Sequence, residues 1–185
     1  MKKVNVLVAV VVICFVFSGF AVAQNNIGFN GVGAFVGFAM PDNIDNTLAF
    51  GAKADLGTIM DGKVAIEGDL SFWKKSEDEG TWEFSYSQLT IGALGKYFLN
   101  PMNSMKPYVG GGVGLTIATA KAEYSGTANQ YVNDWDESDT ELGITLMGGV
   151  NFDLSDTLTG FAEARYQLGG TDTFMIVAGA MFPIG

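Results

Sequence analysis

The sequence contains no histidine and a single cysteine, Cys14. Without histidine the chain lacks the commonest general base at neutral pH and the commonest protein ligand for transition metals. Because Cys14 lies inside an apolar run near the start, the rest of the chain has neither a disulfide framework nor a thiol site. These absences argue against enzyme classes that depend on either side chain.

Basic residues are also scarce, with 10 Lys and Arg against 20 Asp and Glu. Two of the ten, Lys2 and Lys3, lie in the first 23 residues, so the other 162 residues carry eight basic and 20 acidic side chains, a net charge of −12. Such an acidic chain repels phosphate backbones, and nucleic acid is therefore not expected as a partner.

The longest apolar run stands at the very beginning of the chain. Lys2 and Lys3 precede apolar residues from Val4 to Phe17, and Ala21-Val22-Ala23 matches the pattern cut by signal peptidase. We therefore expect residues 1–23 to be a cleaved signal peptide. An uncleaved transmembrane anchor is the alternative, but the run is short for a membrane span.

Lipoprotein processing at Cys14 is a further alternative for this segment. Val11-Val12-Ile13 precede the cysteine, and β-branched residues are a poor match to the small residues that such a site requires. We therefore expect export without lipidation.

Beyond the apolar start, the chain shows eight runs in which apolar side chains alternate with small or polar ones. Alternation with a period of two is typical of a strand with one apolar face. In the clearest run, Leu48, Phe50 and Ala52 share one face while Gly51 and Lys53 share the other. The predicted strands are residues 28–39, 48–57, 64–73, 88–99, 108–117, 141–152, 158–168 and 173–182.

Connections between these runs alternate in length. Those at 59–62, 100–105 and 154–156 are short, whereas those at 40–47, 74–81 and 124–139 are longer. Outer-membrane barrels have short periplasmic turns and longer extracellular loops, and a tilted strand needs about 9–11 residues to cross the bilayer. Residues 24–185 are therefore predicted to form one all-β domain, an eight-stranded antiparallel transmembrane barrel with up-and-down topology.

Two features favour lipid, rather than a protein core, on the apolar side. Aromatic residues stand near both ends of the apolar faces, as expected at the two interfaces of a bilayer. They are Phe50, Phe72, Tyr166 and Phe174 near the loops, and Tyr97, Phe152 and Phe182 near the turns. The mixed faces hold small residues and charges of both signs, which suits a narrow lumen in which buried charges need partners. The predicted lumen network is Lys53, Asp55, Glu67, Asp69, Lys96, Glu163 and Arg165.

Three segments carry a family resemblance: Gly95-Lys96-Tyr97-Phe98, the glycine-rich residues 106–115, and Phe161-Ala162-Glu163-Ala164-Arg165-Tyr166. With them the chain resembles the small outer-membrane barrels of the OmpA and OmpX type. The resemblance implies a bacterial outer-membrane location and contact with the barrel-insertion machinery. Barrels of this family usually end on an aromatic residue, whereas here Pro183-Ile184-Gly185 follows Phe182.

The longest predicted loop concentrates acidic and aromatic residues. Asp134, Asp136, Asp139 and Glu141 supply the hard oxygen ligands that Ca²⁺ prefers, although the glycine of an EF-hand loop is missing. They are a weak metal candidate, and a solvated acidic loop is the alternative. Tyr131 and Trp135 form a candidate contact surface for a partner.

No cofactor is expected, because the glycine run 110–114 lies inside an alternating strand rather than between a strand and a helix. Barrel enzymes of this architecture rely on a histidine that the chain lacks. We therefore expect an envelope-structural or surface-interaction role carried by the loops, with outer-membrane lipid and lipopolysaccharide as neighbours. A narrow gated channel for small solutes is the alternative.

Overall fold

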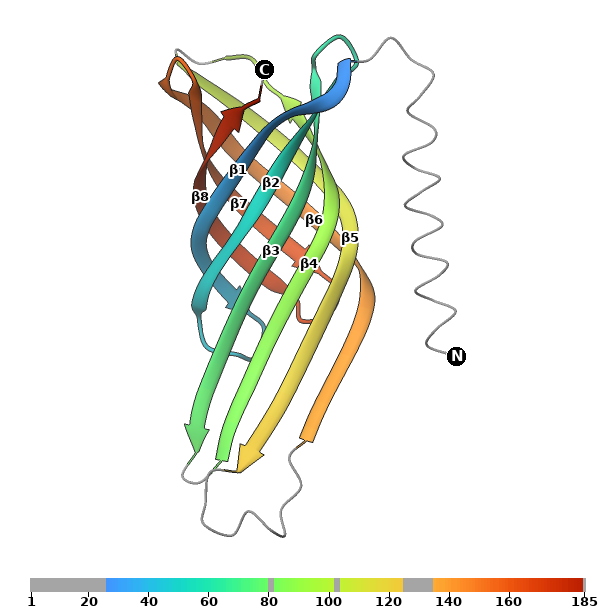
Figure 1. Cartoon of the computed structure of the whole chain (residues 1–185), viewed down its shortest axis with the longest axis vertical. Coiled ribbons are helices and arrows are strands. Elements are labelled where there is room, and N and C mark those ends of the chain that lie inside the picture. The colour runs from blue at the N-terminus through green and yellow to red at the C-terminus, as the bar shows by residue number, and fades with distance from the viewer. Residues whose placement is uncertain (1–25, 80–81, 102–103, 125–134, 185) are drawn as a thin grey trace.

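The computed structural model describes residues 26–79, 82–101, 104–124 and 135–184. These residues form eight antiparallel strands in chain order, and β1 also pairs with β8, which closes a barrel (Figure 1). The strands are β1 (Asn26–Pro41), β2 (Thr47–Ile59), β3 (Val64–Glu79), β4 (Trp82–Phe98), β5 (Met105–Tyr124), β6 (Trp135–Ser155), β7 (Leu158–Leu168) and β8 (Thr173–Pro183). No helix among the described residues is long and apolar enough to span a membrane.

The alternation in the sequence corresponds to the two faces of the closed sheet, and the predicted eight-stranded meander is confirmed. Outward side chains such as Val36, Phe50 and Leu146 are 58%, 53% and 56% exposed. Inward residues such as Lys53 and Phe161 are buried. A broad apolar surface around the outside and a polar interior fit a barrel that stands in lipid.

Aromatic side chains mark both edges of the apolar outer surface. At the loop end, Phe50 and Phe174 are exposed, and Phe50 packs against Phe72 of β3 with ring centroids 5.3 Å apart. At the turn end, Tyr97 and Phe182 are exposed on β4 and β8. Aromatic rings at these two heights fit the girdles at the two membrane interfaces, as the sequence predicted.

Four strands, β3 to β6, extend far beyond their predicted ranges at the loop end of the barrel. Residues 74–79 and 135–139, expected in loops, belong to β3 and β6, and β4 and β5 are longer at the same end. Figure 1 shows β3 to β6 continuing past the other four strands. The strand signal fails here because this part has no lipid to face, so neither face needs to be apolar. Cross-strand pairing still satisfies its backbone groups.

The outer face of β3 to β6 changes abruptly from apolar to polar. Successive cross-strand rows on this face are Leu70, Ile91, Leu115 and Leu142; Phe72, Leu89, Ile117 and Thr140; Lys74, Ser87, Thr119 and Ser138; and Ser76, Ser85, Lys121 and Asp136. The last two rows begin the part of the sheet that stands clear of lipid. We call the strand segments 74–79, 82–87, 119–124 and 135–140 the extracellular sheet.

The last residues of the chain remain paired with β1. Pro183 stands opposite Gly31, and the Ile184 N–H donates to the Asn30 carbonyl oxygen at 2.7 Å. Phe182 points outward at the turn end and is 55% exposed. The extra residues after Phe182 therefore lengthen the closing pair of strands and leave this aromatic side chain in the interfacial belt.

The position of the lipid belt predicts how arginine substitutions will act on β6. Leu146→Arg, in the middle of the belt, should destabilise the barrel in lipid vesicles by about 2–4 kcal/mol. Ser138→Arg, in the first row beyond the belt, should change stability by less than about 1 kcal/mol. Urea titration monitored by tryptophan fluorescence measures both variants. Equal losses would show that the belt has been placed at the wrong height.

Candidate functional site

Six charged side chains meet inside the lumen at mid-barrel. They are Lys53 on β2, Glu67 and Asp69 on β3, Lys96 on β4, and Glu163 and Arg165 on β7. Each is at most 7% exposed. Alternation places them on the inner face of their strands, and barrel closure brings β7 opposite β2, β3 and β4.

Glu163 is the hub of this cluster. Its Oε1 pairs with the Lys96 ammonium at 2.9 Å and also accepts a hydrogen bond from Lys53. Its Oε2 accepts from the Arg165 Nε at 2.7 Å. Glu67 joins the same two lysines, with Oε2 at 3.0 Å from the Lys53 Nζ and Oε1 at 2.8 Å from the Lys96 Nζ. Glu163 therefore contacts all three cations of the cluster, whereas Glu67 contacts only the two lysines.

Asp69 completes the charge balance through Arg165. The Arg165 Nη1 donates to both carboxylate oxygens of Asp69, at 3.2 and 3.0 Å. Three cations thus face three carboxylates within one connected set of ion pairs. Burying a charge is costly unless it is paired and hydrogen-bonded, so the equal numbers are a requirement of this narrow interior.

The sequence also placed Asp55 in this network, and the structure corrects that prediction. Its Oδ1 accepts a hydrogen bond from the Gly57 N–H at 2.8 Å, where the pairing of β2 with β3 shifts register. The carboxylate serves this irregularity of its own strand and makes no ion pair among the described residues. A register shift depends on backbone pairing, which the side-chain alternation did not reveal.

Three uncharged residues of the cluster were missed by sequence reasoning. The Tyr108 hydroxyl donates to Oε1 of Glu163, and the rings of Phe35 and Phe161 face the cations. The Lys53 Nζ lies 4.6 Å from the Phe161 centroid, and the Arg165 Cζ lies 4.5 Å from that of Phe35. Cation–π contact of this kind favours a buried positive charge. The signal in the sequence was an aromatic residue on the mixed face of its strand.

Packing around the charges leaves little space within the barrel. The Phe35 ring lies over Gly51 and the Phe161 ring over Gly179, so closely that a Cβ atom at either glycine would collide with the ring. On the loop side the Gln167 Nε2 donates to the Ser71 Oγ at 3.1 Å. An eight-stranded barrel is just narrow enough for its own side chains to fill. Here the buried side chains around the ion pairs form a plug in the middle of the barrel.

The acidic residues proposed as a metal site do not gather around one point. Asp136 faces outward and pairs with Lys121 at 2.9 Å, and this hydrogen bond raises the pKa of the Lys121 ammonium. Glu141 accepts a hydrogen bond from the Gly170 N–H at 3.0 Å, and Asp139 accepts one from the Thr140 N–H. Among the described residues no group of three acidic side chains is placed to hold a metal ion. Strand alternation separates Asp136 from the other two.

Of the other candidate residues in the predicted loop, only Trp135 lies within the part of the chain that the structure describes. Trp135 is the first residue of β6 and is 53% exposed. Asp134 and Tyr131 lie outside the described residues. The contact surface predicted for a loop is therefore, in its described part, the end of a paired strand.

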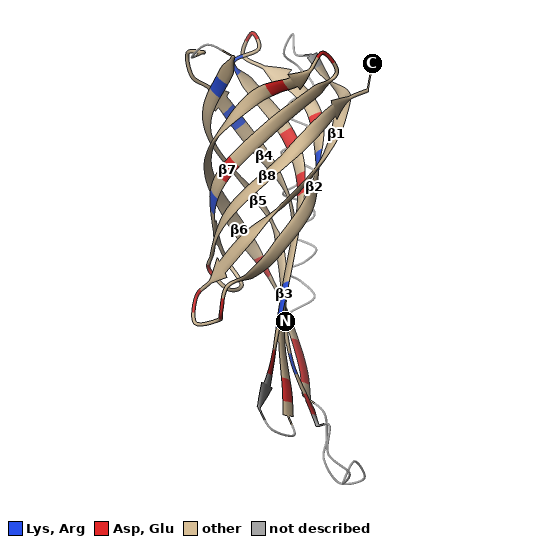
Figure 2. Cartoon of the chain, turned by 90° about the vertical axis from the view of Figure 1, so that its left-hand side faces the viewer, with Lys and Arg blue, Asp and Glu red and all other residues tan. Residues whose placement is uncertain are grey.

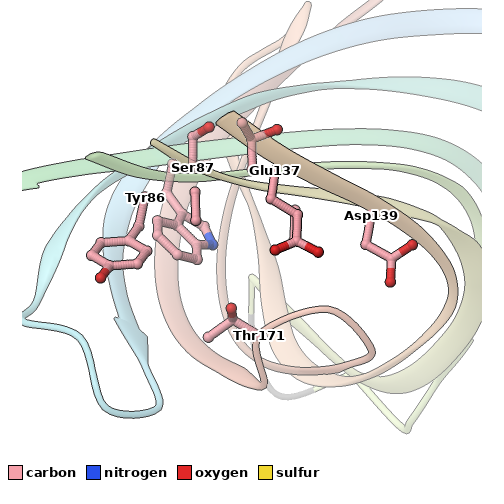
Figure 3. Close-up of a pocket in the computed structure, with 9 residues that line it drawn as sticks. Tyr86, Ser87, Glu137, Asp139 and Thr171 are labelled. Atoms are coloured by element: carbon pink, nitrogen blue, oxygen red, sulfur yellow. The ribbon is translucent and has the colours of Figure 1, made fainter. Parts of the chain in front are cut away.

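A small pocket opens at the mouth of the barrel, beneath the extracellular sheet. It measures about 180 Å³ and is lined in part by Trp73, Tyr86, Glu137, Asp139 and Thr171. Figure 3 shows Tyr86 on one side, Glu137 and Asp139 together on another, and Thr171 below them. Sequence reasoning missed this pocket because Glu137 and Asp139 were assigned to a loop and Tyr86 lies beyond the strand predicted at 88–99.

The ion-pair cluster predicts the effect of removing one cation. Arg165→Ala leaves Asp69 and Glu163 buried with too little positive charge, and it should destabilise the barrel by about 3–5 kcal/mol. Arg165→Lys keeps the charge but loses the planar fork, so its loss should be smaller. Urea unfolding in detergent gives both values.

A matched control is available in the exposed pair of Lys106 and Asp153, whose charged atoms are 4.0 Å apart. Lys106→Ala should cost less than about 1 kcal/mol because water screens this pair. If Arg165→Ala and Lys106→Ala have equal stabilities, the cluster does not contribute as the geometry indicates.

Comparison with solved structures supports the architecture. Neisserial surface protein A is similar with a TM-score of 0.62 and 17% identity, covering 84% of this chain and 96% of that one. A major outer membrane protein of Thermus thermophilus has a TM-score of 0.63, 10% identity, and coverage of 84% and 99%. Ail, the attachment invasion locus protein of Yersinia pestis, has a TM-score of 0.55, 15% identity, and coverage of 85% and 99%.

A search of curated protein sequences returned no match. The sequence model of the outer membrane protein beta-barrel domain, however, matches residues 8–180. This match covers nearly the whole chain and agrees with the closed ring of strands, the apolar belt and the polar lumen. The chain therefore belongs to the outer membrane protein beta-barrel domain family, whose members stand in the bacterial outer membrane.

Proposed function

We propose that residues 24–185 form a non-enzymatic barrel that acts at the cell surface through its extracellular sheet, and that residues 1–23 are the signal peptide for its export. The extracellular sheet is the observation that carries this proposal. Its four strands stay paired beyond the last apolar row and present polar side chains on their outer face. Crossing lipid requires no such sheet, so it is available for contact outside the membrane.

The edges of the extracellular sheet also suit contact with another molecule. On β3 the pairing with β2 ends at Trp73, and on β6 the pairing with β7 ends at Ile144. Residues 74–79 of β3 therefore have no β2 residue beside them, and residues 135–143 of β6 have no β7 residue beside them. These free edges can be reached by another molecule. Charged side chains on such edges discourage uncontrolled strand addition, and Figure 2 shows several acidic residues on this part of the sheet.

The alternative role as a narrow gated channel finds less support. The side chains of Lys53, Glu163 and Arg165 have no exposed surface, and each is held by ion pairs. Opening a path for water would require several of these pairs to separate together. A surface role, by contrast, requires no change in the lumen.

Ligand chemistry can be narrowed by the charge of the extracellular sheet. Ail of Yersinia pestis has been crystallised with the heparin analogue sucrose octasulfate, which is a polyanion. In the extracellular sheet of this chain, the single strand β6 already carries Asp136, Glu137 and Asp139, and the whole chain has a net charge of −10. Like charges repel, so we propose a neutral or cationic partner.

Outer-membrane lipid and lipopolysaccharide are the proposed neighbours of the belt and of the first polar row. Lys74 is exposed in that row, directly beyond Phe72, where an ammonium would meet lipid phosphates. The barrel-insertion machinery is the proposed partner during assembly, through the exposed Phe182 strand.

Trimming the extracellular sheet tests the surface role. Replacing residues 77–84 by Asn-Gly joins the paired Ser76 and Ser85, and replacing 121–136 by Asn-Gly joins the paired Ala120 and Glu137. Asn-Gly forms the two-residue turn that suits paired strands. Displayed on bacteria, the trimmed barrel should lose adhesion to immobilised matrix proteins, while the full barrel adheres.

The trimmed barrel must still fold for this comparison to hold. Its heat-modifiable migration in SDS gels should match that of the parent, because every strand of the belt is retained and closure satisfies the backbone groups. Adhesion that survives the trimming would place the surface activity elsewhere on the barrel.

A further inference from the structure

The pocket at the barrel mouth has a floor of small side chains on β5. Ala118 and Ala120 line it from this strand. Their cross-strand neighbours on β4 are Gln88 and Tyr86, and those on β6 are Asp139 and Glu137. The alanines leave a trough between a wall with an aromatic ring and a wall with two carboxylates, and Figure 3 shows these walls on different sides of the pocket.

The lysines nearest to this trough are engaged with other residues. Lys75 stands opposite Tyr86 in the strand register, but its Nζ pairs with Asp45 at 3.4 Å. Lys121 lies on the outer face and pairs with Asp136. Within the part of the chain that the structure describes, Glu137 has no lysine or arginine partner. Glu137 therefore brings an uncompensated negative charge to the wall formed by β6.

Two buried donors lie in or next to the lining of the trough. Trp73 lines the pocket, is 2% exposed, and has an indole N–H with no acceptor among the described residues. Its cross-strand neighbour Gln88 is 1% exposed, and its Nε2 likewise has no acceptor there. The Gln88 Oε1 already accepts from the Thr171 N–H at 2.9 Å. Buried polar atoms normally have partners, so these two donors indicate a place for a ligand oxygen.

The residue types select an organic cation rather than a metal ion. Calcium takes six to eight oxygen ligands, and the described residues hold no group of three acidic side chains placed for a metal ion. An ammonium or guanidinium group instead gains from aromatic faces and a carboxylate together. At about 180 Å³, the pocket is smaller than the roughly 300–1,000 Å³ of drug-sized sites, and it suits one side chain or one small amine.

We propose that the pocket lined by Trp73, Tyr86, Glu137 and Asp139 binds an alkylammonium or guanidinium group. Glu137 and Asp139 receive the charge, Tyr86 supplies an aromatic face, and Trp73 and Gln88 donate to an oxygen of the same ligand. The group belongs either to a lysine or arginine side chain of a basic peptide or to a free small amine. This inference rests on the proposed surface role and names a ligand class for it.

Titration of the folded full-length barrel in octyl glucoside tests this proposal, since that detergent has no cationic head group to fill the pocket. The probes are acetyl-argininamide, butylguanidine, and acetyl-citrullinamide, which has the shape of the first without its charge. Chemical shifts of the tryptophan indole N–H groups report binding. We expect saturable binding of both cationic probes and none of the citrulline compound. Tighter binding of acetyl-argininamide assigns the site to a peptide side chain, and equal binding assigns it to a free amine.

Two neighbouring residues of β6 provide the matched variants. Glu137→Gln removes an inward carboxylate and should weaken acetyl-argininamide binding about two- to fivefold. Asp136→Asn removes an outward carboxylate one residue away and should weaken it by less than about 1.5-fold. Tyr86→Leu should weaken binding to an extent similar to Glu137→Gln, whereas Tyr86→Phe keeps the ring and should retain most of it.

Three results would overturn the proposal: no saturable binding of either cation, equal binding of the citrulline compound, or equal losses in Glu137→Gln and Asp136→Asn. The last would show general attraction to an acidic surface. The four pocket residues are retained when the extracellular sheet is trimmed. The trimmed barrel should therefore bind the cations although it no longer adheres. An untrimmed barrel that binds the cations but does not adhere contradicts the surface role alone, and an untrimmed barrel that adheres without binding them contradicts the pocket alone.

Discussion

Charge balance in a narrow lumen is the constraint on which the rest of this barrel depends. Eight strands enclose a space that side chains fill, and three cations and three carboxylates occupy its middle. Glu163 touches all three cations, so the removal of one member affects every other. Polar residues are tolerated inside because each charge has a partner, and this frees the outer face to be apolar.

Under the proposed surface role, this division of the barrel places recognition at its loop end. Lipid accounts for the outer face up to the row of Phe72, and the ion-pair cluster accounts for the middle of the lumen. Beyond them, the extracellular sheet is ordered by cross-strand pairing alone, with polar side chains outside and the pocket of Tyr86 and Glu137 at its base. Function carried on a rigid sheet can hold a ligand group more precisely than function carried on a loop.

The sequence predicted the parts of the structure that lipid dictates, and it missed the parts that backbone pairing dictates. Alternation gave the eight strands and the inward placement of Lys53, Glu163 and Arg165, because a lipid face demands an apolar residue at every second position. The extra length of β3 to β6 escaped because a strand in water needs no apolar face. Asp55 was misplaced because a register shift in β2 is invisible in side-chain alternation. Tyr108 was missed because an uncharged side chain on a mixed face gives no sign that it pairs with a buried carboxylate.

The central claim is that the buried ion pairs close the lumen, so that the protein acts from its surface. Conductance of the purified barrel in planar lipid bilayers tests this claim most directly. The account predicts no discrete current steps for the intact barrel, because the paired side chains of Lys53, Glu163 and Arg165 block the path. Reproducible current steps in the intact barrel would contradict it and would favour the channel role.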